Sequence, residues 1–380
     1  MRNPCKQKRF VSHGGDVWGF ARKYSIPLEK VLDFSGPINF LGPSPKAVEA
    51  VKQYARLIRF YPDPNPVEFR KEIAKYVGHG VDEANIILGN GSIELIYMIT
   101  EALPCGFKAV IPVPSFTEYE KAALRVGGEP IFVKLPDDFE LDIESVKKAV
   151  TQDTRIISIC NPHSPSGTLY SKDTVLDLVE FCRKKNIIVS IDENYIEFTE
   201  KEQDTTLAGY VNKYDNLFVI RSVTKFYVMP GIRFGYGIAT EGLIDKLQTV
   251  RQPWSINSLA GYVTLAAFND SEFRKNAKLT IAKERTRFAE MLCEISGLQV
   301  FQSVTNFLLV RILLKKVTAT ILREELAKEG LLIRDCSTFV GLDNSYFRVT
   351  VRALRENKKL IKNLKRILEK KTGNKSYRVE

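Results

Sequence analysis

Lys225 lies in the stretch RSVTKFYVMPGIRFGYG, directly after the apolar run NLFVIRS. A lysine at the end of an expected strand can be a solvated surface charge, a ligand for phosphate or a nucleophilic amine. Hydroxyl groups precede it at Ser222 and Thr224, and a guanidinium follows at Arg233. Other motifs of the chain must decide between the three roles.

Three further motifs contain polar groups that could act with this lysine. The run NIIVSID ends in Asp192, and Tyr195 follows three residues later. A single carboxylate at a strand end is commonly a helix cap or a surface group, so Asp192 alone does not define a site. LGNGSIELIYMI is a glycine-rich turn entering a helix, which offers free N–H groups to an anion. NPHSPSG, residues 161–167, by itself indicates only a loop.

The elements that position these motifs are predicted by alternating patterns between about residues 80 and 240. Five runs without polar alternation are expected as buried strands; they are FKAVIPV, EPIFVKL, TRIISIC, NIIVSID and NLFVIRS. SIELIYMITEAL, FTEYEKAALRVG and SKDTVLDLVEFCRKKN are expected as helices, the last with a serine cap. The alternation predicts an α/β fold with a mostly parallel sheet covered by helices on both faces. Ligands of such folds bind beyond the carboxyl ends of the strands, where Asp192 and Lys225 would lie.

The chain is long for one hydrophobic core, and we expect a large and a small domain. Residues 1–40 are expected as a segment packing on the small domain, 41–270 as the large domain and 271–380 as a small α+β domain. A helix from Ser271 to about Ile295 would leave the large domain. Strands are then expected at LQVFQ, TNFLLVRIL, GLLIRDC and YFRVTVR, with helices near 318–329 and 355–372.

Composition excludes several classes of protein. The chain is 44% hydrophobic and 27% charged, as in ordinary globular proteins. No apolar run approaches the roughly 20 residues that span a bilayer, and the start lacks the apolar region of a secretory signal. The chain has six cysteines, none in a CxxC pair, and only three histidines, so few residues are available as metal ligands. We therefore expect a cytoplasmic protein with reduced thiols, no metal and no membrane contact.

A net charge of +11 raises nucleic acid or an anionic ligand as partners. Much of the excess lies in RENKKLIKNLKRILEKK, where apolar residues recur at helical spacing. Its lysines are therefore expected on the solvated face of a docked helix. No nucleic-acid motif with interleaved aromatic residues is present, so a small anionic ligand is favoured over nucleic acid.

Taken in order, the motifs resemble the fold-type I aminotransferase superfamily, which uses pyridoxal phosphate (PLP). They are the glycine-rich turn, PSFTEY, NPxxPxG, the strand-end Asp, and Ser-x-x-Lys followed eight residues later by Arg. The resemblance covers essentially the whole chain. It implies that PLP binds covalently to Lys225, a role suited to a partly desolvated amine. It further implies that Asp192 pairs with the pyridine nitrogen and that Tyr195 contacts the phenolic oxygen of the ring.

The same resemblance implies the remaining cofactor contacts. Gly91, Ser92, Ile93, Ser222 and Arg233 would hold the cofactor phosphate, and Phe116 would stack on the ring. Ser164 stands where the family usually has an Asn that contacts the phenolic oxygen; its hydroxyl reaches less far, so a water can intervene. Tyr61, in RFYPDPN, matches a tyrosine that reaches the phosphate of a neighbouring subunit, which implies a homodimer with shared sites.

Both ends of the chain resemble the threonine-phosphate decarboxylases more closely. These enzymes convert L-threonine O-3-phosphate to (R)-1-aminopropan-2-ol O-2-phosphate for cobalamin synthesis. The matching segments are SHGGDVWGFARKY, VLDFSGPINFLGP, RQPWSIN, LLIRDCSTF and GLDNSYFRVTVR. The His-Gly-Gly element is the discriminating one, because the related histidinol-phosphate aminotransferases normally lack it.

The substrate contacts that this resemblance implies come from the same segments. His13, with Gly14, and Arg334 would bind the substrate phosphate, and Arg348 would bind its carboxylate. Asn39 would lie near the substrate, two residues after Pro37, which replaces an Asn common in the family and supplies no donor. Taken alone, without the resemblance, His13 is better interpreted as a loop histidine that caps nearby backbone.

Two other functions remain open from the sequence. One is a PLP-dependent aminotransferase, such as one acting on histidinol phosphate. The other is a non-catalytic PLP-binding or nucleic-acid-associated protein, which the positive charge suggests. The presence of Lys225, Asp192 and Arg233 together argues against the second.

Overall fold

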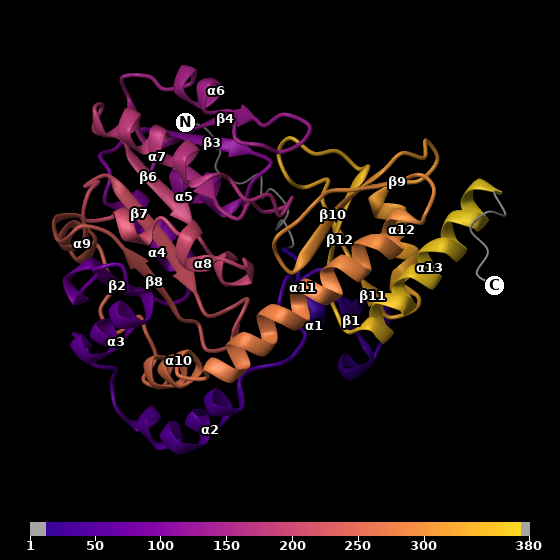
Figure 1. Ribbon diagram of the computed structural model, residues 1–380, viewed down its shortest axis with the longest axis horizontal. Coiled ribbons are helices and arrows are strands. Elements are labelled where there is room, and N and C mark those ends of the chain that lie inside the picture. The colour runs from indigo at the N-terminus through magenta and orange to yellow at the C-terminus, as the bar shows by residue number, and fades with distance from the viewer. Residues whose placement is uncertain (1–12, 374–380) are drawn as a thin grey trace, which may run out of the picture. The chain divides into compact units, whose positions relative to one another are not determined.

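The structure is a computed structural model that describes residues 13–373. The chain forms two compact units (Figure 1). The larger unit comprises residues 38–283 and 302–306, and the described part of the smaller unit comprises residues 13–37, 284–301 and 307–373. The long helix α11 (Ser271–Cys293) contributes to both units.

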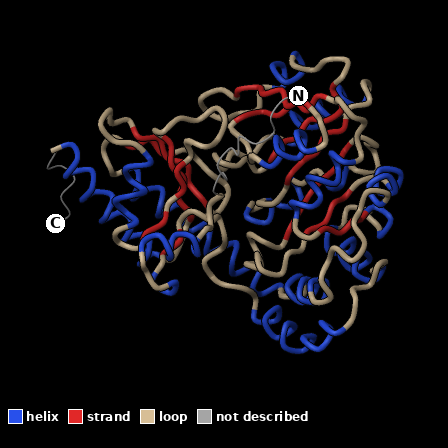
Figure 2. Tube along the Cα trace, turned by 180° about the vertical axis from the view of Figure 1, so that it is seen from behind, coloured by secondary structure: helices blue, strands red, loops and turns tan. Residues whose placement is uncertain are grey.

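A seven-stranded sheet forms the centre of the larger unit, in the order β2-β8-β7-β6-β5-β3-β4. Its strands are β2 (Ile86–Gly89), β3 (Lys108–Val113), β4 (Glu129–Lys134), β5 (Thr154–Cys160), β6 (Ile188–Asp192), β7 (Leu217–Ser222) and β8 (Gly235–Ile238). Only β8 runs antiparallel to its neighbours β2 and β7 among these described strands. Helices lie on either side of the sheet (Figures 1 and 2). The predicted α/β fold with a mostly parallel sheet is confirmed, as are the five predicted strands.

The helices of the larger unit connect and cover these strands. They are α2 (Pro45–Tyr54), α3 (Val67–Val77), α4 (Ser92–Glu101), α5 (Glu118–Arg125), α6 (Ile143–Lys148), α7 (Lys172–Arg183), α8 (Glu202–Thr205), α9 (Glu241–Gln248) and α10 (Ala260–Phe268). The three predicted helices correspond to α4, α5 and α7. The Ser171 side chain accepts a hydrogen bond from the backbone N–H of Thr174, which confirms the predicted cap of α7.

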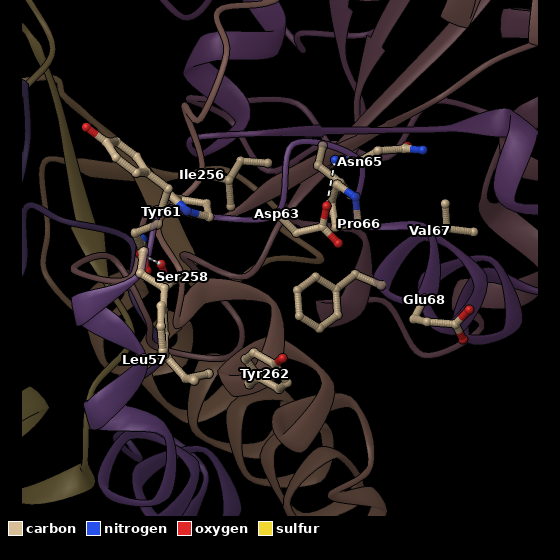
Figure 3. A pocket seen from close by; sticks show the side chains of 15 residues that line it. Leu57, Tyr61, Asp63, Asn65, Pro66, Val67, Glu68, Ile256, Ser258 and Tyr262 are labelled. Carbon is tan, nitrogen blue, oxygen red and sulfur yellow. Dashed lines mark hydrogen bonds between the residues drawn. The ribbon is translucent and has the colours of Figure 1, made fainter.

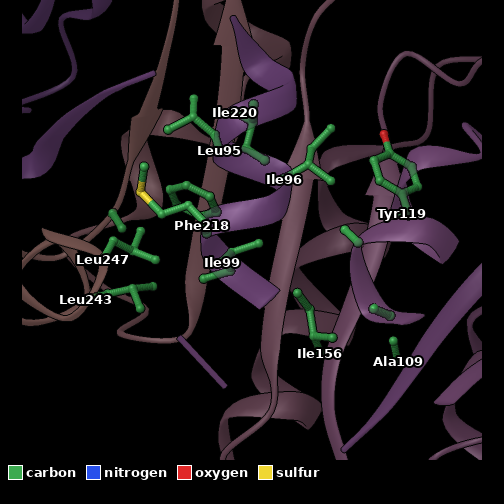
Figure 4. Close-up of a cluster of buried hydrophobic side chains, with 14 of the residues drawn as sticks. Leu95, Ile96, Ile99, Ala109, Tyr119, Ile156, Phe218, Ile220, Leu243 and Leu247 are labelled. Atoms are coloured by element: carbon green, nitrogen blue, oxygen red, sulfur yellow. The ribbon is translucent and has the colours of Figure 1, made fainter. Parts of the chain in front are cut away.

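The apolar core beside the sheet explains why its strands lack polar alternation. Leu95 and Ile99 of α4 lie next to Phe218 of β7, and Leu243 and Leu247 of α9 complete that side (Figure 4). All five are nearly or fully buried. Strands covered by helices carry apolar residues at successive positions, as these do.

The smaller unit is an α+β arrangement. Its elements are α1 (Val17–Tyr24), β1 (Leu32–Asp33), β9 (Leu298–Val300), β10 (Phe307–Ile312), α12 (Ala319–Ala327), β11 (Leu331–Leu332), β12 (Arg334–Asp335), β13 (Tyr346–Thr350) and α13 (Leu354–Thr372). Four strands form a sheet in the order β12-β13-β10-β9. Strand β1 pairs in parallel with β11, so the described part of the N-terminal segment belongs to this unit.

Helix α13 carries much of the positive charge on its outer face. Leu360, Leu364 and Leu368 are buried, whereas Lys358 and Lys362 are exposed. This confirms that these lysines lie on the solvated side of a docked helix. Between residues 13 and 373 no helix has the length and apolarity to cross a bilayer.

Candidate active site

The carboxyl ends of β5, β6 and β7 deliver side chains to one cavity of about 170 Å³ in the larger unit. It is lined by Ser92, Ile93, Phe116, Cys160, Ser164, Asp192, Asn194, Tyr195, Ser222, Thr224, Lys225 and Arg233. The structure thus brings together most of the residues that the sequence motifs singled out for a cofactor. They come from five separate segments, so the cavity depends on the fold of the whole unit.

Asp192 is the buried acid of this cavity, with 4% of its surface exposed. The Tyr119 hydroxyl donates to its Oδ2 at 2.7 Å, and the backbone N–H of Asn194 donates to its Oδ1 at 2.9 Å. Burial raises the pKa of Asp192 to about 6, although both hydrogen bonds and the charge of Lys225 act in the opposite direction. A cationic partner would therefore stabilise the ionised carboxylate at this position.

The turn before α4 forms an anion cradle. Gly91, at the N-cap, has a φ of 78°, and a Cβ there would lie 2.7 Å from a guanidinium nitrogen of Arg233. A Cβ on Gly235 would lie 2.6 Å from the backbone nitrogen of Ser92. The two glycines therefore let the arginine and strand β8 approach the first N–H groups of the helix. Free helix N–H groups next to a guanidinium suit a phosphate.

The sequence reasoning missed Cys160, which lines the cavity, and two residues that hold the site together, Asn194 and Tyr119. Asn194 donates from Nδ2 to the Ser92 hydroxyl at 2.9 Å and so links the anion cradle to the loop after Asp192. Tyr119, already described, holds Asp192 from α5. Tyr119 lies within the PSFTEY motif and Asn194 lies between Asp192 and Tyr195, but their roles depend on contacts with distant segments.

Asn39 braces the backbone at Lys225. Its N–H donates to the Lys225 carbonyl at 3.1 Å, and its Nδ2 donates to the Phe226 carbonyl at 3.0 Å. Its Oδ1 accepts from the N–H of Leu41 at 3.0 Å. The side-chain amide thus has a backbone partner at each end, which fixes the lysine-bearing loop.

The turn that carries Ser164 is tied to the segment before Phe116 by a buried histidine. His163 lies with Nε2 2.8 Å from the Pro114 carbonyl and with Nδ1 2.6 Å from the Ser166 hydroxyl. Burial lowers the pKa of His163 to about 4, so the ring is neutral near pH 7. Nε2 must then donate to the carbonyl, and Nδ1 accepts from Ser166. His163 is therefore a structural link between two cofactor-facing segments.

A second set of predicted residues lies in the smaller unit. Arg334 of β12 and Arg348 of β13 are direct cross-strand partners, and each is about 95% buried. The Arg334 guanidinium lies 5.2 Å from the Phe339 ring centre, and that of Arg348 lies 4.8 Å from the Phe307 ring centre. Burial, together with the like charge of Arg348, lowers the pKa of Arg334 to about 10.

His13 lies at the rim of a cavity of about 320 Å³ in this unit. Its lining includes His13, Gly14, Lys23, Ser35, Arg323 and Arg334. A Cβ on Gly14 would lie 2.2 Å from the Ser35 carbonyl oxygen, and the N–H of Gly15 donates to the Ser35 hydroxyl at 2.8 Å. The glycine pair thus lets the segment that carries His13 press against the backbone of the Ser35 turn.

Tyr61 lies elsewhere on the larger unit, with 83% of its surface exposed. Its ring centre is 5.3 Å from that of Trp254, which is also exposed. Tyr61 lines a cavity of about 440 Å³, and its ring points away from Tyr262 (Figure 3). The chain thus presents two large aromatic side chains to solvent.

In a comparison with known protein families, residues 30–367 match the family Aminotransferase class I and II. A relative provisionally named threonine-phosphate decarboxylase, from Caldanaerobacter subterraneus subsp. tengcongensis, is 36% identical over 97% of each chain. The crystal structure of histidinol-phosphate aminotransferase from Clostridium acetobutylicum is 32% identical, with a TM-score of 0.83 over 90% of this chain and 100% of that one. The structure of L-threonine-O-3-phosphate decarboxylase from Porphyromonas gingivalis is 28% identical, with a TM-score of 0.79 over 88% and 99%.

Proposed function

Because the chain belongs to the class I and II aminotransferase family, which depends on pyridoxal phosphate, we propose that it decarboxylates an O-phosphorylated amino acid. The preferred substrate is L-threonine O-3-phosphate, and the product is (R)-1-aminopropan-2-ol O-2-phosphate, a precursor for cobalamin. The observation that carries the proposal is the pair of buried arginines, Arg334 and Arg348. They belong to the smaller unit, whereas the anion cradle belongs to the larger unit. A substrate with two anionic groups, a phosphate and a carboxylate, suits two such cations.

The residues of the larger unit fit the cofactor. The N–H groups at the start of α4, with Ser222 and Arg233, offer donors for its phosphate. Asp192 is buried and its pKa is raised, and its carboxylate could pair with the protonated ring nitrogen. When bound, PLP supplies an electron sink for the pair of electrons released at the substrate Cα. We assign Lys225 as the residue that binds PLP covalently, Phe116 as the one that covers the ring, and Tyr195 and Ser164 as partners of its phenolic oxygen.

The residues of the smaller unit are assigned to the substrate. Arg334 and His13, with the close-packed Gly14, would bind the phosphate, and Arg348 would bind the carboxylate. Asn39, which belongs to the larger unit, would act near the substrate by holding the Lys225 loop, because both ends of its amide already have backbone partners. Arginines stacked on aromatic rings keep their charge and have few free torsions, so anion binding costs them little conformational entropy.

The reaction depends on which substituent of the substrate Cα is held perpendicular to the cofactor ring. Loss of CO2 would require the carboxylate in that position, whereas transamination would require the hydrogen there, with Lys225 as the base that takes the proton. Anchoring the substrate at two anions restricts its rotation about the Cα–N bond. The His-Gly-Gly segment against the Ser35 turn favours the decarboxylase, because it offers an additional donor at His13.

A second candidate is a PLP-dependent aminotransferase that acts on histidinol phosphate. The 32% identity to the Clostridium acetobutylicum enzyme supports it. Histidinol phosphate carries a phosphate but no carboxylate. Arg348 would then bind the carboxylate of the keto-acid acceptor instead, so the additional donor at His13 is what favours the decarboxylase over this candidate.

We further propose a homodimer in which Tyr61 reaches the cofactor phosphate of the neighbouring subunit. Its exposure of 83%, next to the exposed Trp254, supports this assignment. Exposed aromatic pairs of this kind are common in protein interfaces. Analytical sedimentation of the wild type and of Tyr61→Ala measures the oligomeric state, and PLP occupancy is measured in parallel. The two measurements together test the assignment.

Two measurements test the proposed function. Borohydride reduction of the PLP-loaded protein, followed by peptide mapping, should locate PLP on Lys225, and Lys225→Ala should show no label. Steady-state consumption of threonine phosphate should exceed that of threonine in kcat/KM by at least about 100-fold, which corresponds to about 2.7 kcal/mol of phosphate recognition. Label at another lysine would refute the cofactor assignment. Equal use of both substrates would refute the phosphate site.

A further inference from the structure

The backbone pairing between β6 and β7 stops where the proposed catalytic residues begin. Asp192 and Ile220 are the last residues paired across the two strands. One more backbone hydrogen bond follows, from the N–H of Glu193 to the Ile220 carbonyl, at 2.8 Å. Beyond that point one chain continues to Tyr195 and the other to Lys225. Side chains must therefore hold the two strand tips in register.

The next residue on each strand supplies that link. Arg221 Nε donates to Glu193 Oε2 at 3.0 Å, and both residues are at most 1% exposed. The Thr206 hydroxyl accepts from Arg221 Nη2 at 2.7 Å and donates to Glu193 Oε2 at 2.8 Å, which closes a ring of three side chains. Glu193 Oε1 accepts the backbone N–H of Leu207 at 2.7 Å. The pair is thus hydrogen-bonded on several sides, as a stable buried ion pair requires.

A second carboxylate extends this network away from the cofactor cavity. Arg221 Nη1 lies 3.4 Å from Glu202 Oε1, and Lys278 Nζ lies 2.8 Å from Glu202 Oε2. Neither Arg221 nor Glu193 is among the side chains that line the cavity, whereas their chain neighbours Ser222, Asp192 and Asn194 are. The guanidinium therefore lies behind the site and contacts the carboxylate behind the opposite strand tip.

We propose that the Arg221–Glu193 ion pair is a positioning device that sets the distance between the Asp192 carboxylate and the Lys225 amine. The inference rests on the proposed cofactor roles of Asp192 and Lys225, but not on the identity of the substrate. Arg221 and Glu193 touch neither cofactor nor substrate in this account. Their effect passes through the backbone, because each precedes or follows a cofactor-facing residue directly.

The decisive variant is the double substitution Arg221→Met with Glu193→Gln. Removing both charges leaves no buried ion alone, Gln keeps an acceptor for the Leu207 N–H, and Glu202 keeps Lys278. We expect the double variant to retain most of the wild-type melting temperature. The visible circular dichroism per bound PLP should fall at least about twofold and kcat should fall about 10–100-fold, as expected for a misalignment of about 1 Å. Arg221→Lys, which keeps the charge but loses the planar fork, should show the same changes to a smaller degree.

Lys278→Met is the matched control, because it removes a cation from the same network without touching Glu193. It should lower the melting temperature and leave both the circular dichroism per bound PLP and kcat near wild type. The proposal would be overturned if the double variant has the dichroism per bound PLP of the wild type and a kcat within about twofold of the wild-type value. If the double variant does not fold, Arg221→Lys replaces it in the test. Wild-type dichroism and an unchanged kcat in Arg221→Lys would then overturn the proposal. Borohydride trapping on the wild type separates this failure from a failure of the Lys225 assignment, since trapping depends only on where PLP binds.

Discussion

Arg334 and Arg348 lie directly opposite each other on neighbouring antiparallel strands, both buried and each against an aromatic ring. Like charges at opposed positions of a sheet destabilise it. Burial is the main cause of the lowered pKa of Arg334, and the charge of Arg348 adds to it. An anion that binds between or beside the two guanidinium groups would offset the repulsion, which is why we assign them to the substrate.

Arg334→Met should weaken binding of threonine phosphate by about 10–150-fold, or about 1.5–3 kcal/mol, the range for a hydrogen bond to a charged group. Binding of threonine, which lacks the phosphate, should barely change. Arg348→Met is the matched comparison and should weaken both ligands alike, because both carry the carboxylate. Calorimetric titration of each ligand gives the four affinities. Equal losses for both ligands in Arg334→Met would show that the residue serves the fold or the carboxylate.

His13→Ala should produce the same selective loss as Arg334→Met, but a smaller one. His13 is exposed, whereas Arg334 is buried, and an interaction screened by water contributes less. The absorbance of bound PLP should not change, since His13 is assigned to the substrate phosphate and not to the cofactor. A change in that absorbance, or an unchanged ratio of the two affinities, would mean that His13 only caps nearby backbone.

The affinity for PLP should fall below about pH 6. Asp192 in the cofactor-free site has a pKa of about 6, and the protonated ring nitrogen favours the ionised carboxylate. Below that pH the carboxyl must release a proton before PLP binds, so affinity should fall by up to about tenfold per pH unit. Fluorescence titration of the apoprotein with PLP between pH 5 and 8 measures this. Asp192→Asn provides the control, because it retains the titration of the PLP phosphate and lacks that of the carboxyl. Identical pH profiles for both proteins would contradict the assignment of Asp192.

Tyr119→Phe should move that pH profile to higher pH. The Tyr119 hydroxyl bonds the ionised form of Asp192 and so lowers its pKa against the effect of burial. Removing the hydroxyl should raise the pKa, so that the loss of PLP affinity begins closer to neutrality. The same titration tests it. A shift toward lower pH, or none, would show that the hydrogen bond does not control the charge of Asp192.

Glu197 should make the apoprotein less stable as the pH rises. Burial, followed by the charge of Glu202, raises the pKa of Glu197 from 4.5 to about 8. Between these values the unfolded chain loses a proton that the folded chain keeps, so the free energy of unfolding should decrease from about pH 4.5 to about pH 8. Urea unfolding of wild type and Glu197→Gln at pH 5 and pH 8 should show a smaller decrease for the variant. An equal decrease would mean that Glu197 is ionised in the fold.

Strong local patterns explain which parts of the fold were predictable. Long apolar runs and amphipathic stretches predicted five strands and three helices of the larger unit, and the family resemblance of the motifs at their ends predicted most of the residues lining the cavity. Strands β2 and β8 were missed because each has four residues, and β8 alternates Gly235 and Gly237 with apolar residues. Such short segments carry no periodic signal, and they pair only because β7 provides an edge.

Contacts between distant segments explain what could not be predicted in the site. Tyr119 and Asp192 are 73 residues apart, and Asn194 and Ser92 are 102 apart. The sequence shows that Glu193 follows Asp192, but its role depends on Arg221 of the neighbouring strand and could not be predicted from that position. The cross-strand register of Arg334 and Arg348 likewise follows from the sheet, not from their spacing in the chain.

The most direct test of the proposed function is to follow the two products of one reaction. The PLP-loaded protein is incubated with L-threonine O-3-phosphate labelled at the carboxylate, and released CO2 and phosphorylated keto acid are measured together, with and without an added keto acid as amino acceptor. The proposal predicts CO2 in amounts equal to the substrate consumed, independent of the acceptor, and no keto acid. Keto acid formed only when the acceptor is present, with the label retained in it, would contradict decarboxylation and identify an aminotransferase.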